Sequence, residues 1–217
     1  MARRPQTTRT KGTTDDATER ARNGTDRRRE LLDLAAEVFA DKGVAHTTVR
    51  DIADRAGILS GSLYHHFQSK NQMVAEVLER GLRESAKRDA RIVADAGDPL
   101  DAIGTLIYNL VLWVGQEPYV ARILASDQQY LKDSTDLVDV ERERQTNLLL
   151  WIDVVRSGIE AEVFDRRLDP EVSVRLILTG VLACTRWLPP LGKDEPDAVG
   201  RQLASFYVSG LVGSGTE

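Results

Sequence analysis

The sequence predicts an all-α protein of about nine helices, divided into a small three-helix N-terminal domain and a larger helical C-terminal domain. From Asp26 onward, apolar residues recur with helical spacing, and no alternating stretch is long enough for a β-sheet. Charge divides the chain in a similar way. Residues 1–70 carry 13 Lys and Arg against 10 Asp and Glu, whereas residues 71–217 carry 16 against 24. This asymmetry is typical of a protein that binds phosphate groups through its N-terminal part only.

Composition excludes several classes of protein. The 217 residues are 41% apolar and 29% charged, as in ordinary globular proteins. No apolar run approaches the roughly 20 residues that a membrane-spanning helix needs, and no apolar core of a secretory signal follows the basic N-terminus. The single cysteine, Cys184, excludes an internal disulfide. We therefore expect a cytoplasmic protein with no membrane partner.

Residues 1–25 are rich in Thr and Arg and contain almost no large apolar side chain. Such a segment buries too little surface to offset its ordering entropy, which predicts a disordered arm. A solvated tail is one interpretation of this arm. In the other, Arg3, Arg4 and Arg9 reach DNA phosphates or the minor groove.

Residues 26–70 have the pattern of three helices. An apolar stripe from Leu31 to Phe39 predicts the first helix, which Gly43 ends. Thr48 then begins a second helix, with Asp51 at the capping-box position.

A glycine turn at Gly57 separates the second helix from a third, expected from about Ser60 to Phe67 with Leu63 and Phe67 turned inward. Two short helices joined in this way form a helix-turn-helix.

Ser69 is expected to cap a long fourth helix, and the remaining chain, residues 71–217, has the pattern of one larger helical domain. Gly and Pro breakers separate its segments. The expected helices span residues 70–96, 98–117, 119–131, 134–163, 169–187 and 195–213.

The residue types around the two short helices suit DNA. Hydroxyl groups, backbone N–H groups and the positive end of a helix can hold a phosphate, and small residues let a helix tip approach the bases. Serine bonds several base edges, and an apolar side chain can meet a thymine methyl group. The predicted DNA-binding residues are Thr47, Thr48, Arg50, Leu59, Ser60, Gly61, Ser62, Tyr64, His65 and Lys70.

Some of these residue types have a purely structural alternative. Thr48 is first an N-cap, which stabilises a helix by about 1 kcal/mol with or without DNA. His66 more simply packs or forms a hydrogen bond inside the small domain. His65 and His66 point about 100° apart on a helix, and no carboxylate or thiol joins them, so no metal site is expected.

The segment TTVRDIADRAGILSGSLYHHFQSK, residues 47–70, resembles the DNA-binding signature of the tetracycline-repressor-like (TetR) family. That signature pairs a T-[V/I]-x-x-I-A-x-x-A-G opening with a recognition helix that ends L-Y-x-H-F and a following Lys. The chain matches it without a gap. The resemblance implies that Thr48 and Arg50 lie near the backbone and bases. It also implies base contacts by residues 60–62, and phosphate contacts by Tyr64, His65 and Lys70.

The segment ILSGSLYHHF, with weaker likeness around GIEAEVF and TRW, resembles a branch of this family from mycolic-acid actinobacteria. That branch includes a repressor of cholesterol-ring catabolism that senses a steroid acyl-CoA. The likeness implies a dimeric repressor with an effector of related chemistry.

Family members carry a helical ligand-binding domain behind the DNA-binding domain. Residues 100–114 are apolar nearly all round, which predicts a buried central helix. A pocket needs mostly apolar walls and a few polar groups, and Arg186 could meet a carboxylate or phosphate. Ordinary packing is the alternative for each candidate. The pocket candidates are Tyr108, Trp113, Tyr119, Tyr130, Asn147, Trp151, Thr179, Arg186 and Trp187.

The last two expected helices are more apolar than a solvated surface allows, which favours half of a four-helix dimer interface. The interface candidates are Leu176, Val181, Leu203, Phe206 and Tyr207.

All three histidines lie in the N-terminal domain, and the chain has no Ser-His-Asp motif, metal-spaced cluster or phosphate-binding glycine loop. We therefore expect neither enzyme activity nor a cofactor. The expected function is a ligand-responsive transcriptional regulator, a repressor that binds a palindromic operator as a homodimer. A small apolar or acyl-CoA-type effector would release it. The alternative is a DNA-binding regulator or activator without small-molecule input.

Overall fold

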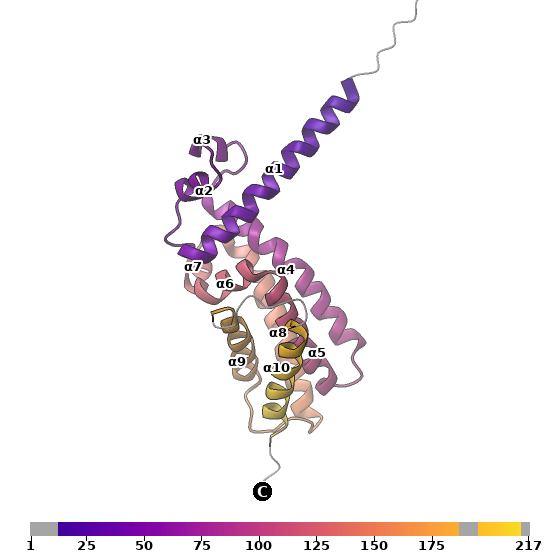
Figure 1. Ribbon diagram of the computed structural model, residues 1–217. Coiled ribbons are helices and arrows are strands. Elements are labelled where there is room, and N and C mark those ends of the chain that lie inside the picture. Colours follow the sequence, from indigo (N-terminus) through magenta and orange to yellow (C-terminus); the bar gives the residue numbers. More distant parts are fainter. Residues whose placement is uncertain (1–12, 187–194, 214–217) are drawn as a thin grey trace, which may run out of the picture.

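The structure, a computed structural model, describes residues 13–186 and 195–213 (Figure 1). Within these ranges it contains α-helices and two 3-10 helices but no strand, which confirms the all-α prediction. The elements are α1 (Thr13–Lys42), α2 (Val49–Arg55), α3 (Ser60–Leu63), α4 (Lys70–Asp95), α5 (Pro99–Gln116), α6 (Pro118–Ser126), α7 (Gln128–Asp133), η1 (Thr135–Leu137), α8 (Val138–Glu160), α9 (Pro170–Ala183), η2 (Cys184–Arg186) and α10 (Glu195–Val212).

Helix α1 begins at Thr13, so residues 13–25 are helical, although we expected them to lie in a disordered arm. The physical reason is cooperativity, because extending a helix whose second half is already packed costs far less than nucleating a new one. The segment also contains Ala, Glu and Arg, which favour helices. Residues 1–12 of the expected arm lie outside the described residues. In Figure 1 the N-terminal half of α1 projects beyond the rest of the molecule.

The N-terminal domain, here called the head, comprises the described residues up to Lys70. Helix α1 packs against α2 and α4, and α2 packs against α3. The head core consists of fully buried apolar side chains, including Leu31, Phe39, Ile52 and Leu63. Most of these side chains belong to the apolar patterns that predict the three helices.

The C-terminal domain, here called the body, is built around α5, which packs against α4, α8, α9 and α10. The body differs from the prediction at residues 119–131, expected to form one helix. The chain breaks at Asp127, whose φ of −108° and ψ of 24° are not helical, and so α6 and α7 are separate. This break gives ten α-helices in the described ranges, where about nine were expected.

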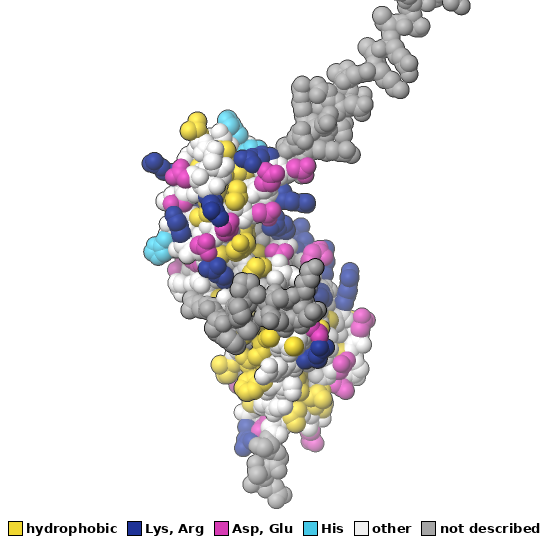
Figure 2. Space-filling view, viewed as in Figure 1, with side chains coloured by type: hydrophobic (Ala, Val, Ile, Leu, Met, Phe, Trp, Pro, Cys, Tyr) yellow, Lys and Arg dark blue, Asp and Glu magenta, His cyan; other side chains and the backbone are white. Residues whose placement is uncertain are grey.

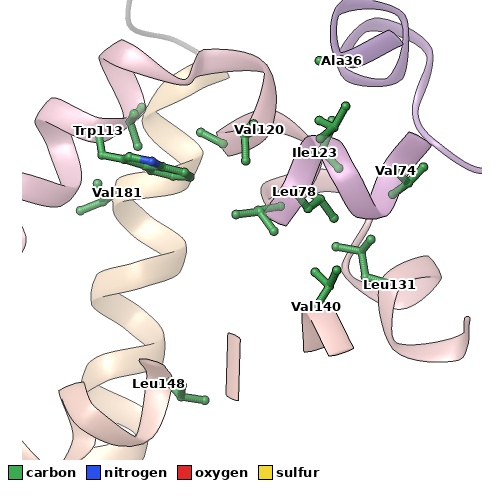
Figure 3. Packing of buried hydrophobic residues seen from close by; sticks show 14 of the residues in the cluster. Ala36, Val74, Leu78, Trp113, Val120, Ile123, Leu131, Val140, Leu148 and Val181 are labelled. Carbon is green, nitrogen blue, oxygen red and sulfur yellow. The ribbon is translucent and has the colours of Figure 1, made fainter. Parts of the chain in front are cut away.

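Head and body share one continuous apolar core. Helix α1 packs against α6 as well as α4. Figure 3 shows Ala36 of α1 facing Ile123 of α6, with Leu78 and Val120 beyond. The head is therefore seated on the body by a packed contact, and α4 runs through both parts (Figure 1).

Within the body, Trp113 lies beside Val181 (Figure 3), and its indole Nε1–H donates to the backbone oxygen of Gly81 at 3.0 Å. None of the described helices is long and apolar enough to cross a membrane.

Candidate DNA-binding surface and internal cavity

Helix α2 starts with the capping box that the sequence predicts. Thr48 Oγ1 accepts the Asp51 N–H at 3.2 Å, and the Thr48 N–H donates to Asp51 Oδ2 at 2.8 Å. The Thr48 hydroxyl also donates to Asp51 Oδ2 at 2.6 Å, and Lys42 Nζ lies 2.6 Å from Asp51 Oδ1. The Lys42 ammonium and the bonds from Thr48 hold the pKa of the Asp51 carboxyl well below its usual range. The first turn of α2 is thus fixed before any DNA arrives.

The turn after α2 also follows the prediction. Gly57 has a φ of +67°, in the left-handed region where glycine is favoured. Its N–H donates to Asp54 O, and the Ile58 N–H reaches back to Ala53 O at 3.0 Å. This pair of bonds is the Schellman pattern, which satisfies the last carbonyls of α2 and turns the chain into α3.

Helix α3 is shorter than expected. It spans Ser60–Leu63, and the residues up to His66 form a turn instead of continuing the helix to Phe67. The N–H groups of His66 and Phe67 both donate to Leu63 O at 2.9 Å, so the helix closes there. Leu63 and Phe67 are buried, as predicted.

One surface of the head presents the tip of α3, the turn after it and the outer side of α2. Leu59 is 80% exposed and Tyr64 is 57% exposed. The Arg50 side chain is 84% exposed, with its Nε 3.7 Å from Asp54 Oδ2. Gly61 and His65 are exposed as well. We call Arg50, Leu59, Gly61, Tyr64 and His65 the reading face.

The other predicted DNA-binding residues lie outside the reading face. Thr48, Ser60 and Ser62 border the reading face, but Ser60 and Ser62 are half-buried. Thr47 is buried, and its hydroxyl donates to Gly43 O at 2.8 Å.

Lys70 is directed into the protein. Its Nζ donates to Val44 O at 2.7 Å and to Thr47 O at 3.0 Å, and it lies 5.2 Å from the centre of the Tyr130 ring. Burial lowers the pKa of Lys70. In this conformation Lys70 and Thr47 shape the loop between α1 and α2, so contact of either side chain with DNA stays a prediction.

Arg28 of the head and Glu76 of α4 form a contact that was not predicted from the sequence. Both guanidinium NH groups of Arg28 donate to the Glu76 carboxylate, and the guanidinium carbon lies 4.5 Å from the centre of the Phe67 ring. The pair ties the first helix of the head to α4. The two residues are 48 positions apart, so no local pattern in the sequence indicates this contact.

Among the described residues, no group of three His, Cys, Asp or Glu side chains could hold a metal ion.

The body contains a cavity of about 290 Å³ enclosed by α4, α5, α8 and α9, with the ends of α6 and α7 at one side. Its volume is just below the range of about 300–1,000 Å³ that is usual for small-molecule sites. Three cations, Lys132, Arg144 and Arg175, line it together with Glu141 and Glu143. The other lining residues are Leu82, Ser85, Ala86, Leu110, Trp113, Leu124, Gln128, Gln145, Asn147, Leu148, Leu178, Thr179 and Leu182.

Three predicted pocket residues, Trp113, Asn147 and Thr179, line this cavity. Tyr108 instead donates its hydroxyl to Asp197 of α10, and Tyr130 donates its hydroxyl to Asn71.

Neither Tyr119 nor Trp151 is among the residues that line the cavity. Tyr119 is exposed, and Trp151 is buried. The side chain of Arg186 and all of Trp187 lie outside the described residues.

A buried carboxylate that the sequence analysis missed lies next to the cavity. Asp89 is only 4% exposed, and its Oδ2 accepts hydrogen bonds from Asn147 Nδ2 and Trp151 Nε1, both at 3.0 Å. Burial raises the pKa of Asp89, although the two hydrogen bonds act against this. In the sequence Asp89 stands within a charged run, which looks like a solvated helix face. The signal that was available is its helical spacing from apolar residues, since Leu82 lies seven positions before Asp89 and Ile92 lies three positions after it.

The outer faces of α9 and α10 carry large apolar side chains in solvent. Leu176 is 65% exposed and Phe206 is 70% exposed, and Val172 and Val212 are exposed as well. Figure 2 shows hydrophobic side chains gathered on the part of the surface where these helices lie. Exposure on this scale is typical of an interface.

The tip of the Tyr207 side chain from α10 reaches Gly180 of α9, where a Cβ would lie 2.0 Å from the Tyr207 hydroxyl oxygen. Of the predicted interface residues, Leu203 and Tyr207 are half-buried and pack against the core of their own chain. Val181 differs from the prediction because it is buried inside the chain, against Trp113 (Figure 3).

Two family models match the chain. The model described as bacterial regulatory proteins of the tetR family matches residues 31–77. The model described as the tetracyclin repressor-like C-terminal domain matches residues 96–211.

Several proteins are similar over most of their length. The HTH-type transcriptional repressor KstR2 of Mycolicibacterium smegmatis is 37% identical, over 87% of this chain and 92% of its own. KstR2 of Rhodococcus jostii is 34% identical, over 86% and 91%. The solved structure of the ketosteroid transcriptional regulator KstR2 of Mycobacterium tuberculosis is 36% identical. It matches with a TM-score of 0.78 over 87% of this chain and 96% of that one.

Proposed function

Because the chain belongs to the TetR family of bacterial transcriptional regulators, we propose that its reading face binds a palindromic operator and that the body controls this binding. The chain is accordingly a regulator of transcription and not an enzyme. It acts in the cytoplasm, where the DNA is.

The exposed side chains at the tip of α3 are the single observation that carries the DNA-binding proposal. Leu59 and Tyr64 are large, yet they lie in solvent at the two ends of the helix that follows the glycine turn. Such residues suit a surface that is covered when a partner binds. The base contacts come from residues 59–62, and Arg50, Tyr64 and His65 hold phosphates.

A dimer formed through α9 and α10 contains two heads. The exposed Leu176 and Phe206 supply the apolar centre of that interface. Two heads about 34–36 Å apart then read two half-sites one DNA turn apart, which matches a palindrome.

The cavity supports an effector with an apolar part and an anionic part. Leucine side chains and Trp113 offer the apolar surface. Lys132, Arg144 and Arg175 can attract phosphate or carboxylate groups, for which Arg144 and Arg175 would exchange their present ion pairs with Glu141 and Glu171. An acyl-CoA has both parts, with the acyl group inside and the phosphates toward the cations. The description of the M. tuberculosis relative as a ketosteroid regulator supports an effector of this apolar kind. Effector binding lowers operator affinity and relieves repression.

Two experiments test this function with the full-length protein. Selection from a random DNA library should enrich a palindrome, and failure to enrich any sequence would remove the DNA-binding proposal. Acyl-CoA thioesters of graded size, each titrated into the complex, should then release the DNA. Retention of DNA at saturating concentrations of every thioester would favour a regulator without small-molecule input.

A further inference from the structure

We propose that Asp127 is a positioning residue of the DNA-reading head, because its carboxylate ties the loop between α1 and α2 to the body. The link from this role to operator affinity rests on the function proposed above. The geometry itself does not.

The central contact joins two residues that are 83 positions apart. Asp127 Oδ1 accepts the backbone N–H of Val44 at 2.9 Å. Val44 is fully buried and Asp127 is 9% exposed, so water competes little for this bond. A buried N–H that loses its acceptor pays the full desolvation penalty of that group, which gives the contact a strong preference for one arrangement.

Lys70 holds Val44 through its carbonyl oxygen, whereas Asp127 holds it through its N–H. Its ammonium group donates to the carbonyl oxygens of Val44 and Thr47, while Asp127 accepts the Val44 N–H. The loop is therefore fixed at both polar groups of Val44. Since Thr48, at the end of this loop, is the N-cap of α2, the position of the loop sets where α2 and the reading face begin.

The carboxylate serves the head instead of its own helix. Asp127 occupies the N-cap position of α7, where an Asp side chain normally accepts a backbone N–H of the first turn. No such bond forms here. Its second oxygen, Oδ2, is buried and has no hydrogen-bond partner within the structure described, so the Lys70 ammonium group supplies the compensating charge. A residue placed only to start α7 would not be arranged in this way.

The sequence neighbours of Asp127 connect it to the cavity, although Asp127 itself does not line it. Leu124, three residues before it, and Gln128, directly after it, both line the cavity. A change in the cavity wall at these residues therefore reaches the Val44 contact through one short backbone segment. Tyr130 of α7 also contacts the first residues of α4, because its hydroxyl donates to Asn71 Oδ1 and its ring lies against Lys70.

The test compares Asp127→Ser with Asp127→Asn. Serine still suits an N-cap position, but its side chain is too short to reach Val44, whereas asparagine keeps an acceptor oxygen there. Asp133→Ser is the matched control, because Asp133 is an exposed residue of α7 whose carboxylate accepts hydrogen bonds from Gln129 of the same helix. Thermal unfolding of each variant checks that the body remains folded.

Two measurements read the head position without DNA. The first is hydrogen exchange at the Val44 amide. The second is the distance between two spin labels, attached to the cysteines that Asp54→Cys introduces in the head and Asp139→Cys introduces in the body, with Cys184→Ser as background. Dilution with unlabelled chains isolates distances within one chain.

We expect Asp127→Ser to raise the Val44 exchange rate at least about tenfold and to broaden the distance distribution. Asp133→Ser should stay close to the unaltered protein, and Asp127→Asn should change clearly less than Asp127→Ser, because asparagine keeps the acceptor for Val44 but loses the charge that faces Lys70. Operator affinity, measured with the selected palindrome, should fall about tenfold only in Asp127→Ser.

Unchanged exchange and an unchanged distance distribution in Asp127→Ser would overturn the proposal. Equal changes in Asp127→Asn would also overturn it, since the acceptor would then be irrelevant. If the unaltered protein binds no DNA, the proposed function fails while both measurements of head position remain decisive.

Discussion

Among single residues, Asp89 is the clearest case of a charge held in an unfavourable place. It is buried beside the cavity and relies on Asn147 and Trp151 for its hydrogen bonds. Burial raises its pKa, so the folded protein holds this proton to a higher pH than the unfolded chain does. Its contribution to stability is full below the unfolded pKa, about 4, and is lost as the pH rises through the folded pKa.

Asp89→Asn should therefore change the pH profile of stability. Asparagine keeps an acceptor for Asn147 and Trp151 and has no proton to lose. The free energy of unfolding of the variant, relative to the unaltered protein, should rise from about pH 4 upward and then level off. Urea unfolding followed by tryptophan fluorescence measures it, with Asp95→Asn on the exposed side of α4 as control. Parallel profiles between about pH 4 and 8 would contradict this account of Asp89.

Arg50 is the residue of the reading face whose charge is most available. Its side chain is 84% exposed, and the nearest carboxylate oxygen, from Asp54, is 3.7 Å away. Arg50→Ala should weaken operator binding and reduce the slope of log affinity against log salt by about 1. Arg142→Ala, which removes an exposed arginine from α8, is the control. An unchanged slope for Arg50→Ala would exclude a phosphate contact.

Residues whose roles depend on near neighbours were predictable from the sequence. Thr48 with Asp51, and Gly57 in the turn, follow from spacings of a few positions. Lys70 and Asp127 did not follow, because their partners lie 23 to 83 positions away. Only the folded chain brings those carbonyl and amide groups together.

At the scale of elements, α2 depends on its first turn. The helix has only seven residues, so it is too short to be stable alone and needs its cap and its packing. The capping box at Thr48 supplies two of the missing hydrogen bonds.

Thr48→Ala should lower the free energy of unfolding by about 1 kcal/mol, whereas Thr48→Ser should retain most of the stability. Urea unfolding of both variants at neutral pH measures the difference. Equal stability of the alanine variant and the unaltered protein would show that the box contributes nothing to this fold.

Element boundaries were harder to predict than the elements themselves. Helix α3 ends at Leu63, because two N–H groups share the Leu63 carbonyl, and the pattern of Leu63 and Phe67 alone cannot show this. The break between α6 and α7 likewise depends on a hydrogen bond that the apolar pattern cannot show. A carboxylate that serves the head interrupts a segment whose apolar spacing fits one helix.

In the whole molecule, we propose that a second copy of the chain covers the apolar surface of α9 and α10, since a two-fold axis brings identical surfaces together. Phe206→Glu should separate the dimer, because it places a charge at the centre of that surface. Leu149→Glu is the matched control, since Leu149 is an exposed apolar residue on α8. Sedimentation velocity measures the mass of each variant. A Phe206→Glu variant that remains dimeric would place the interface elsewhere.

The division into a small head and a larger, acidic helical body was predictable, because the apolar periodicity, the helix breakers and the charge balance all change along the chain. The cavity was only partly predictable. Trp113, Asn147 and Thr179 line it, but Tyr108, Tyr130 and Trp151 hydrogen-bond elsewhere. Aromatic residues on buried helix faces look alike in sequence, and the direction of each side chain is decided by how the helices cross.

The central claim is that two reading faces, held by one dimer, bind one palindrome. Fluorescence anisotropy with the selected palindrome, and with the same DNA after one half-site is scrambled, tests it most directly. The account predicts two chains per palindrome and an affinity at least about tenfold lower for the scrambled DNA, because half of the base contacts are lost. Equal affinity for the two DNAs, or one chain per palindrome, would contradict it.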